Sequence, residues 1–233
     1  MNVFADFFNF LARGGPAMFG LFACSLVAIA VVVERLLFFA QQRVDSEALL
    51  KQITDRVARD DFAGAIAICD ENRGMLPKIL KVALLRARRS RSDVAEALSA
   101  ALKRQLPAFD RNLPVIGTLA VISPFVGLFG TVLGIIHAFD DIALKGNSSP
   151  AVVAAGVGEA LVTTAAGLFV AVISVVFFNY FKTRIKAYNQ EMIVAANQLA
   201  EMLHFHNVGE PIPTDLYKPA ATGKPGPAVA GAS

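Results

Sequence analysis

Residues 160–181 read ALVTTAAGLFVAVISVVFFNYF and contain no Asp, Glu, Lys or Arg over 22 positions. A helix that crosses a bilayer needs about 20 consecutive residues that are mostly apolar. The apolar pattern reaches back to about Pro150 and is interrupted once, by Glu159. Residues 150–181 therefore predict a membrane-spanning helix that carries one carboxylate.

Two further runs are long enough to span a membrane. Residues 14–33 hold no charge over 20 positions and end at Glu34-Arg35, and residues 112–139 hold no Asp, Glu, Lys or Arg over 28 positions. The chain of 233 residues is 55% hydrophobic and 18% charged, against roughly 45–50% and 25% for a soluble domain. The sequence therefore predicts an all-α integral membrane protein with three transmembrane helices.

The first of these runs also has the length of a cleaved leader. A signal peptide combines a basic start with a short apolar core, whereas only Arg13 precedes this run and the start is otherwise acidic and aromatic. The apolar pattern also continues well past Cys24, where a lipoprotein leader would be cut. Both observations favour a retained span.

The distribution of charge sets the expected orientation. Residues 41–111 carry 14 Lys or Arg against 10 Asp or Glu, whereas residues 140–149 carry one Lys and two Asp. Because basic residues stay on the cytoplasmic side, we expect the N-terminus in the periplasm and the C-terminus in the cytoplasm of a bacterial inner membrane. The expected segments are a periplasmic amphipathic N-terminus (1–13), a first span (14–39), a cytoplasmic helical domain (40–111), a second span (112–139), a periplasmic hairpin (140–149), a third span (150–181), a cytoplasmic helix (182–206) and a disordered Pro/Gly/Ala-rich tail (207–233).

The middle segment has apolar residues at helical spacing and no strand-like alternation. Its basic cluster, Arg86, Arg88, Arg89 and Arg91, indicates a solvated helix surface rather than a nucleic-acid site. Two cysteines exclude a disulfide scaffold. Because the sequence shows neither a nucleophile–base pair, a metal cluster nor a nucleotide-binding loop, we expect no enzyme activity, metal or cofactor.

Glu159 is the one charge that falls well inside a predicted span. A carboxylate in a span is costly and marks an ion path or a buried pairing, and no Lys or Arg lies in any span to pair with it. The alternative is a carboxylate at the outer interface, because the start of a helix favours negative charge.

Small and hydroxylic residues form a stripe on each of two spans, at about 100° of rotation per residue. Such stripes let helices pack closely, but two of them beside a carboxyl also fit a polar pore lining or a docking face for another helix. Three helices with one carboxyl do not make a complete transporter, so we expect an oligomer, a foreign subunit, or both. The stripe residues are Gly156, Thr163, Thr164, Gly167 and Ser174 on the third span, and Ser123, Gly127, Gly130, Thr131 and Gly134 on the second.

The runs SPFVGLFGTVLGII at 123–136 and GEALVTTAAGL at 158–168 closely resemble the ExbB/TolQ branch of the MotA/TolQ/ExbB proton-channel family. Glu34-Arg35-Leu36 is also similar, and the resemblance covers roughly residues 10–205. It implies a pentamer around the transmembrane helices of an ExbD-like or TolR-like single-span subunit, whose aspartate carries protons. It further implies a TonB-like or TolA-like transducer that passes motion to the outer membrane.

Carried over by position, the resemblance implies that Thr131 faces the pore and that Glu159 and Thr164 belong to the proton path. Helical phase alone favours Thr163, which is closer to Glu159. The expected path therefore includes Thr131, Glu159, Thr163, Thr164 and Ser174, and the expected packing or docking residues are Ser123, Gly127, Gly130, Gly134, Gly156 and Gly167. Family members often have Pro where this chain has Ile173, so the pore shape near that position stays open.

The expected function is that of an inner-membrane proton-channel and stator subunit that couples the proton motive force to TonB-dependent outer-membrane transport. One alternative is a TolQ-like subunit of an envelope-constriction system, or another motor stator. A second alternative is a membrane scaffold whose stripes only pack helices. Membrane lipid is an expected partner in each case.

Overall fold

The computed structural model describes residues 15–42, 44–145 and 150–210, and every regular element in these ranges is a helix. The expected all-α class is therefore confirmed for this part of the chain. The predicted N-terminal segment 1–13 and nearly all of the predicted tail lie outside the described residues. The helices are α2 (Gly15–Gln41), α3 (Ser46–Val57), α4 (Phe62–Glu71), α5 (Met75–Leu84), α6 (Arg91–Asp110), α7 (Leu113–Lys145) and α8 (Pro150–Val208).

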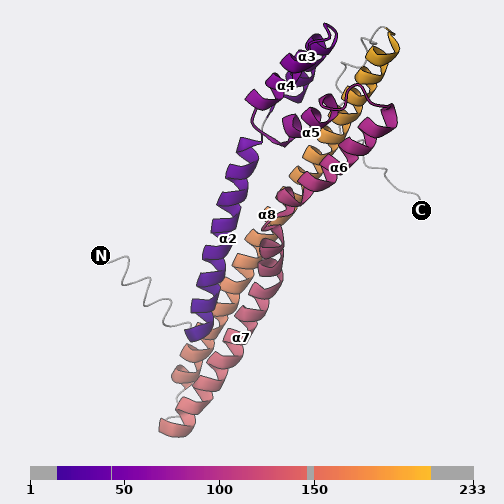
Figure 1. Ribbon diagram of the computed structural model, residues 1–233. Coiled ribbons are helices and arrows are strands. Elements are labelled where there is room, and N and C mark those ends of the chain that lie inside the picture. The colour runs from indigo at the N-terminus through magenta and orange to yellow at the C-terminus, as the bar shows by residue number, and fades with distance from the viewer. Residues whose placement is uncertain (1–14, 43, 146–149, 211–233) are drawn as a thin grey trace, which may run out of the picture. The chain divides into compact units, whose positions relative to one another are not determined.

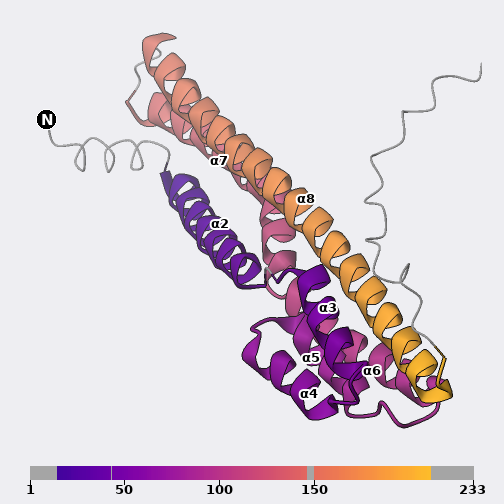
Figure 2. The same cartoon turned by 90° about the horizontal axis from the view of Figure 1, so that it is seen from above.

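The chain forms two compact units, and long helices contribute to both. We call Met1–Phe38 with Asp110–Ile185 the apolar unit, and Phe39–Phe109 with Lys186–Ser233 the charged unit. In the apolar unit α2, α7 and the first part of α8 run side by side (Figures 1 and 2). The charged unit gathers α3, α4, α5 and α6 with the last part of α8.

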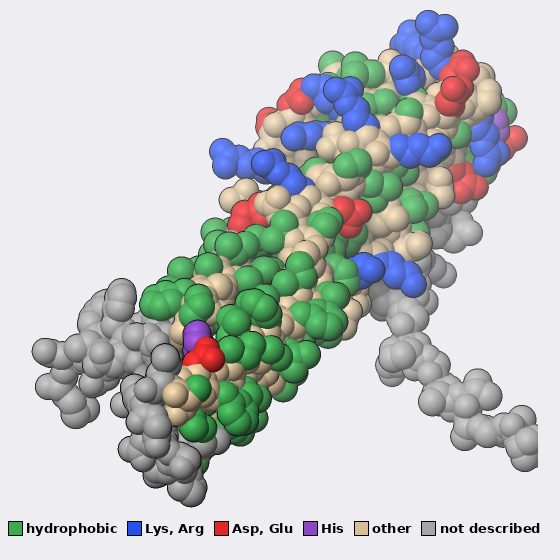
Figure 3. All heavy atoms as spheres, turned by 90° about the horizontal axis from the view of Figure 1, so that it is seen from below, with side chains coloured by type: hydrophobic (Ala, Val, Ile, Leu, Met, Phe, Trp, Pro, Cys, Tyr) green, Lys and Arg blue, Asp and Glu red, His purple; other side chains and the backbone are tan. Residues whose placement is uncertain are grey.

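The outer surface of the apolar unit is hydrophobic. Three helices of the described residues are long and apolar enough to cross a membrane. Figure 3 shows hydrophobic side chains covering most of this unit. Large side chains such as Phe125 (65% exposed) and Phe169 (68% exposed) stand outward, as the surface of a lipid-embedded helix requires.

Two helices run further than the charge pattern suggests. α7 continues to Lys145, into the stretch expected to form the hairpin. α8 is 59 residues long in total and continues past Phe181 to Val208 without a break. Charge marks where a helix leaves lipid, but the helix itself depends on backbone hydrogen bonds, which Lys and Arg support well. Just beyond the apolar stretch, Lys182 Nζ lies 4.8 Å from the ring centre of Phe178, so its stem covers apolar surface while its charge stays near water.

The charged unit is held by short, well-capped helices around an apolar core. Asp45 accepts hydrogen bonds from the backbone N–H groups of Glu47 and Ala48 at the start of α3, and Asp61 accepts one from Gly64 at the start of α4. Gly74 precedes α5 with φ +136°, a conformation that side-chain-bearing residues rarely adopt. The fully buried core side chains include Ile53, Val57, Ile79, Leu80, Leu199 and Met202.

Candidate functional site

The two motif-bearing helices of the apolar unit, α7 and α8, are packed at backbone distance. A Cβ added to Gly167 would stand 2.6 Å from the carbonyl oxygen of Ser123 and 2.9 Å from Cα of Gly127. A Cβ added to Gly127 would in turn stand 3.1 Å from Cα of Thr164. These residues therefore bring α7 and α8 together within one chain, because only glycine leaves room for the facing backbone.

The same contact fixes the direction of the two helices. An added Cβ on Gly134 would lie 2.8 Å from Cβ of Ala160, and one on Gly156 would lie 2.7 Å from Cβ of Ala138. As residue numbers rise along α7, the partner numbers on α8 fall. The helices are therefore antiparallel, and Ala138 and Ala160 mark two positions that point straight at the opposite helix.

Thr163 lies on the side of the α7–α8 pair that α2 covers. A Cβ on Gly130 would meet Cγ2 of Thr163 at 2.4 Å and Cβ of Ala17, in α2, at 3.0 Å. Thr163 is 1% exposed, and its hydroxyl donates to the backbone carbonyl of Glu159 at 3.3 Å. Its side chain therefore lies inside the three-helix contact.

Thr131 and Thr164 lie together on the opposite side of the pair. The Thr131 hydroxyl donates to the carbonyl oxygen of Leu128 at 2.6 Å, and the Thr164 hydroxyl donates across the helix pair to that of Gly127 at 3.0 Å. The two acceptors belong to consecutive residues of α7, so the two hydroxyls are neighbours. This side, which we call the open face, carries outward-standing apolar side chains, among them Leu128, Leu161 and Leu168, each more than half exposed.

The remaining predicted path residues lie elsewhere. Glu159 is exposed, and it shares the side of Thr163 rather than the open face, because it precedes the contact residue Ala160 by one position. Ser174 is fully buried and donates to the carbonyl of Val170 at 2.8 Å. α8 continues unbroken through Ile173, the position where family members often have proline. The structure therefore joins Thr131 with Thr164 and separates both from Glu159.

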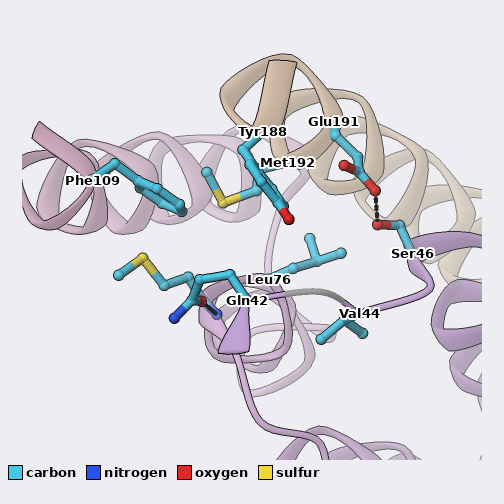
Figure 4. A pocket seen from close by; sticks show the side chains of 9 residues that line it. Gln42, Val44, Ser46, Leu76, Phe109, Tyr188, Glu191 and Met192 are labelled. Carbon is cyan, nitrogen blue, oxygen red and sulfur yellow. Dashed lines mark hydrogen bonds between the residues drawn. The ribbon is translucent and has the colours of Figure 1, made fainter. Parts of the chain in front are cut away.

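The charged unit contains a small cavity where several of its segments meet (Figure 4). Its volume is about 20 Å³, which holds roughly one water molecule. Gln42 Oε1 accepts from the Met75 N–H at 3.0 Å, and the Ser46 hydroxyl donates to Glu191 on its rim. The cavity is too small for an organic ligand or cofactor, and no cluster of metal-binding side chains occurs in the described residues.

Comparison with known proteins shows which family this sequence belongs to. The sequence model of the MotA/TolQ/ExbB proton channel family matches residues 70–193. The chain belongs to this family. It is 31% identical over 204 residues to the biopolymer transport protein ExbB of Neisseria meningitidis serogroup A, an alignment that covers 80% of this chain and 91% of that protein.

Other members of the MotA/TolQ/ExbB family match less of the chain or match by fold. The Tol-Pal system protein TolQ of Haemophilus influenzae is 34% identical over 114 residues, which cover 49% of this chain and 50% of TolQ. A solved structure described as "Structure of C. jejuni MotAB" has a TM-score of 0.57 at 20% identity, covering 88% of this chain and 77% of that chain. The resemblance seen in the motifs is thus confirmed, and the family is one of membrane channel subunits rather than enzymes.

Proposed function

We propose that this chain is an ExbB-type subunit of the bacterial inner membrane that couples the proton motive force to TonB-dependent transport at the outer membrane. The Neisseria ExbB relatives support this assignment, because they align with 80% of the chain, whereas the TolQ relatives and the ExbB of Pseudomonas putida align with about half of it. The positive-inside distribution of Lys and Arg supports a periplasmic N-terminus and a cytoplasmic charged unit.

The neighbouring hydroxyls of Thr131 and Thr164 on the open face carry the proposal. Each hydroxyl uses its hydrogen on a carbonyl of α7, so each oxygen keeps lone pairs with which to accept a hydrogen bond. A protonated carboxylic acid on a partner helix, or a water molecule, can donate to such an oxygen, whereas an ionised carboxylate has no hydrogen to donate. Thr131 is buried (9% exposed) and Thr164 is half-buried, so these two acceptors lie at the edge of the apolar open face. A partner group that reaches them is favoured in its protonated, neutral form.

The rest of the open face supports an assembly around that partner. Its outward apolar side chains fit a ring of identical subunits, a pentamer by family resemblance, enclosing the apolar helix of an ExbD-like subunit. Protons would reach the partner's aspartate from the periplasm, and the resulting motion would pass to a TonB-like transducer. Glu159 would relay or tune the path near its outer end.

Isosteric substitutions test this role of the hydroxyls. Thr131→Val and Thr164→Val keep the side-chain shape but remove the acceptor oxygen, so we expect lower proton flux in vesicles that contain the complex, and lower TonB-dependent uptake in cells. Thr118→Val is the matched control, because the Thr118 hydroxyl also bonds within α7, to Pro114, at an exposed position outside this pair. Equal flux in all three variants would contradict the proposal.

A second substitution tests the carboxylate. Glu159→Ala should abolish uptake while the complex still assembles, and uptake at the wild-type level would contradict its role in the path. A scaffold that only packs helices would show no pH-dependent proton flux even as the wild-type complex.

A TolQ-type role is the second candidate, because TolQ proteins match about half of the chain at 34–37% identity. Co-purification separates the two roles. Capture of an ExbD-like subunit together with restored TonB-dependent uptake supports the ExbB-type role. Capture of a TolR-like subunit together with restored envelope constriction supports the TolQ-type role instead.

A further inference from the structure

His137 occupies the same side of the α7–α8 pair as Glu159. His137 precedes Ala138 by one position, and Glu159 precedes Ala160 by one position, and both alanines point at the opposite helix. The preceding residue on a helix is rotated by about 100° around the helix axis. Because α7 and α8 are antiparallel and face each other, this rotation points both preceding side chains to the same side of the helix pair. The imidazole and the carboxylate therefore stand on one face, and both are exposed.

The two side chains also lie at nearly the same height. Gly134 faces Ala160 and Ala138 faces Gly156, so Glu159 is level with residue 135 of α7. His137 is two residues further along, which is about 3 Å along the axis. Tightly packed helices are about 8 Å apart, so a water molecule can join the imidazole and the carboxylate, which make no direct hydrogen bond or ion pair with each other.

α2 does not extend along this level in the described residues. Ala17 of α2 lies beside Gly130 of α7. His137 is seven residues, or about 10 Å, further along α7. α2 begins only two residues, or about 3 Å, before Ala17, so its first described residue does not reach the level of His137. Figures 1 and 2 show the α7–α8 pair extending past the first turn of α2.

Among the described residues, few other titratable groups lie near His137. On α7, Asp140 and Asp141 follow it by three and four residues, and the Asp140 side chain is exposed. On α8, Glu159 is the one acidic or basic residue between Pro150 and Phe181, and α2 carries none before Glu34. Titratable groups on a lipid-facing surface are costly and occur where they pair or line a water-filled path, so their placement on one face points to joint use.

We propose that His137 and Glu159 form the outer proton-uptake site of the channel, with His137 passing protons from periplasmic water to Glu159. An N–H bond of the imidazolium breaks as the carboxylate gains an O–H bond, which leaves His137 neutral and able to take up the next proton. Imidazole suits this step because one ring nitrogen can accept a proton while the other donates one. The inference rests on the proposed channel function and adds to it the group that first receives the proton.

The test measures proton flux into membrane vesicles that hold the full chain with its single-span partner, with the outer pH varied from 5 to 8. His137→Asn should lower the flux by about tenfold or more, as expected for removal of a positioned proton-transfer group, and should flatten its dependence on pH. His204→Asn, the same substitution in the charged unit, should match the wild type. Unchanged flux and pH dependence in His137→Asn would overturn the inference.

A further variant separates proton transfer from a purely structural role. His137→Ala should regain flux when imidazole is added to the buffer, and failure of that rescue in an assembled complex would overturn the inference. Absence of flux in the wild-type complex would contradict the proposed channel function itself.

Discussion

Gly167 offers a quantitative test of the α7–α8 contact. In Gly167→Ala the new Cβ would stand 2.6 Å from the Ser123 carbonyl oxygen, and 2.9 and 3.1 Å from Cα and N of Gly127. All three atoms belong to the α7 backbone and cannot rotate away, so the helices must separate by on the order of 0.5–1 Å to restore normal contact distances. Over-packing of this kind costs about 1–3 kcal/mol.

The control lies on the same helix. Nothing stands within 4 Å of a Cβ added to Gly158, so Gly158→Ala should be neutral or stabilise by up to about 1 kcal/mol through helix propensity. Thermal unfolding of the detergent-solubilised protein measures the difference. At about 2–4 °C per kcal/mol for a chain of this size, Gly167→Ala should lower Tm by about 2–12 °C. The same Tm for both variants would refute the close packing of α7 against α8.

Three further outcomes follow from the structure. Burial raises the pKa of the Cys69 thiol from 9.0 to about 11, with a smaller contribution from Asp70. Because the thiolate is the reactive form, the folded chain should react with a maleimide at Cys69 about 100-fold more slowly than the unfolded chain at pH 8. Equal labelling rates would contradict the burial of Cys69. The Gly64 N–H, and secondarily Arg56, hold the pKa of Asp61 below its usual 3.8, so the stability that Asp61 contributes is complete above that pH and is lost as pH falls through the lower folded value. Asp61→Ala should therefore unfold earlier than the wild type at pH 7 by a margin that shrinks below pH 3.8, and a margin independent of pH would argue against this cap. Arg35 is 1% exposed, and its Nε and Nη2 donate to the two carboxylate oxygens of the half-exposed Glu34 at 2.6 and 2.5 Å. Lysine cannot make this bidentate contact, so Arg35→Lys should lower the free energy of unfolding by about 1 kcal/mol, measured by thermal unfolding. A variant as stable as the wild type would show that one donor suffices.

The three apolar helices were predictable because lipid demands long uncharged runs, and each such run is visible in the sequence. The absence of strands from the middle segment followed from the spacing of its apolar residues. The unbroken course of α8 past Phe181 was not predictable from polarity, because a sequence shows where side chains meet water but not whether the backbone continues as a helix.

The sequence suggests which residues form the candidate site but not how they are arranged. The motif residues on α7 and α8 were recognisable, yet a helical wheel placed Thr163 and Thr164 on one small face. The contact of Gly130 with Thr163 shows that the interhelical seam runs between these threonines, so one joins Thr131 and the other is enclosed against α2. His137 does not stand out in the sequence, because its relation to Glu159 depends on which residues of the two antiparallel helices face each other.

The internally bonded hydroxyls bear on how such a subunit is made. Six hydroxyls of the apolar unit, on Thr118, Ser123, Thr131, Thr163, Thr164 and Ser174, donate to backbone carbonyls of the same chain. A newly synthesised protomer can therefore leave the translocation machinery and reside alone in the bilayer without exposing these donors to lipid. Glu159 differs, because no side chain of the described residues makes a direct hydrogen bond or ion pair with its exposed carboxylate. In an unassembled protomer this carboxylate therefore depends on water for its hydrogen bonds until partners arrive.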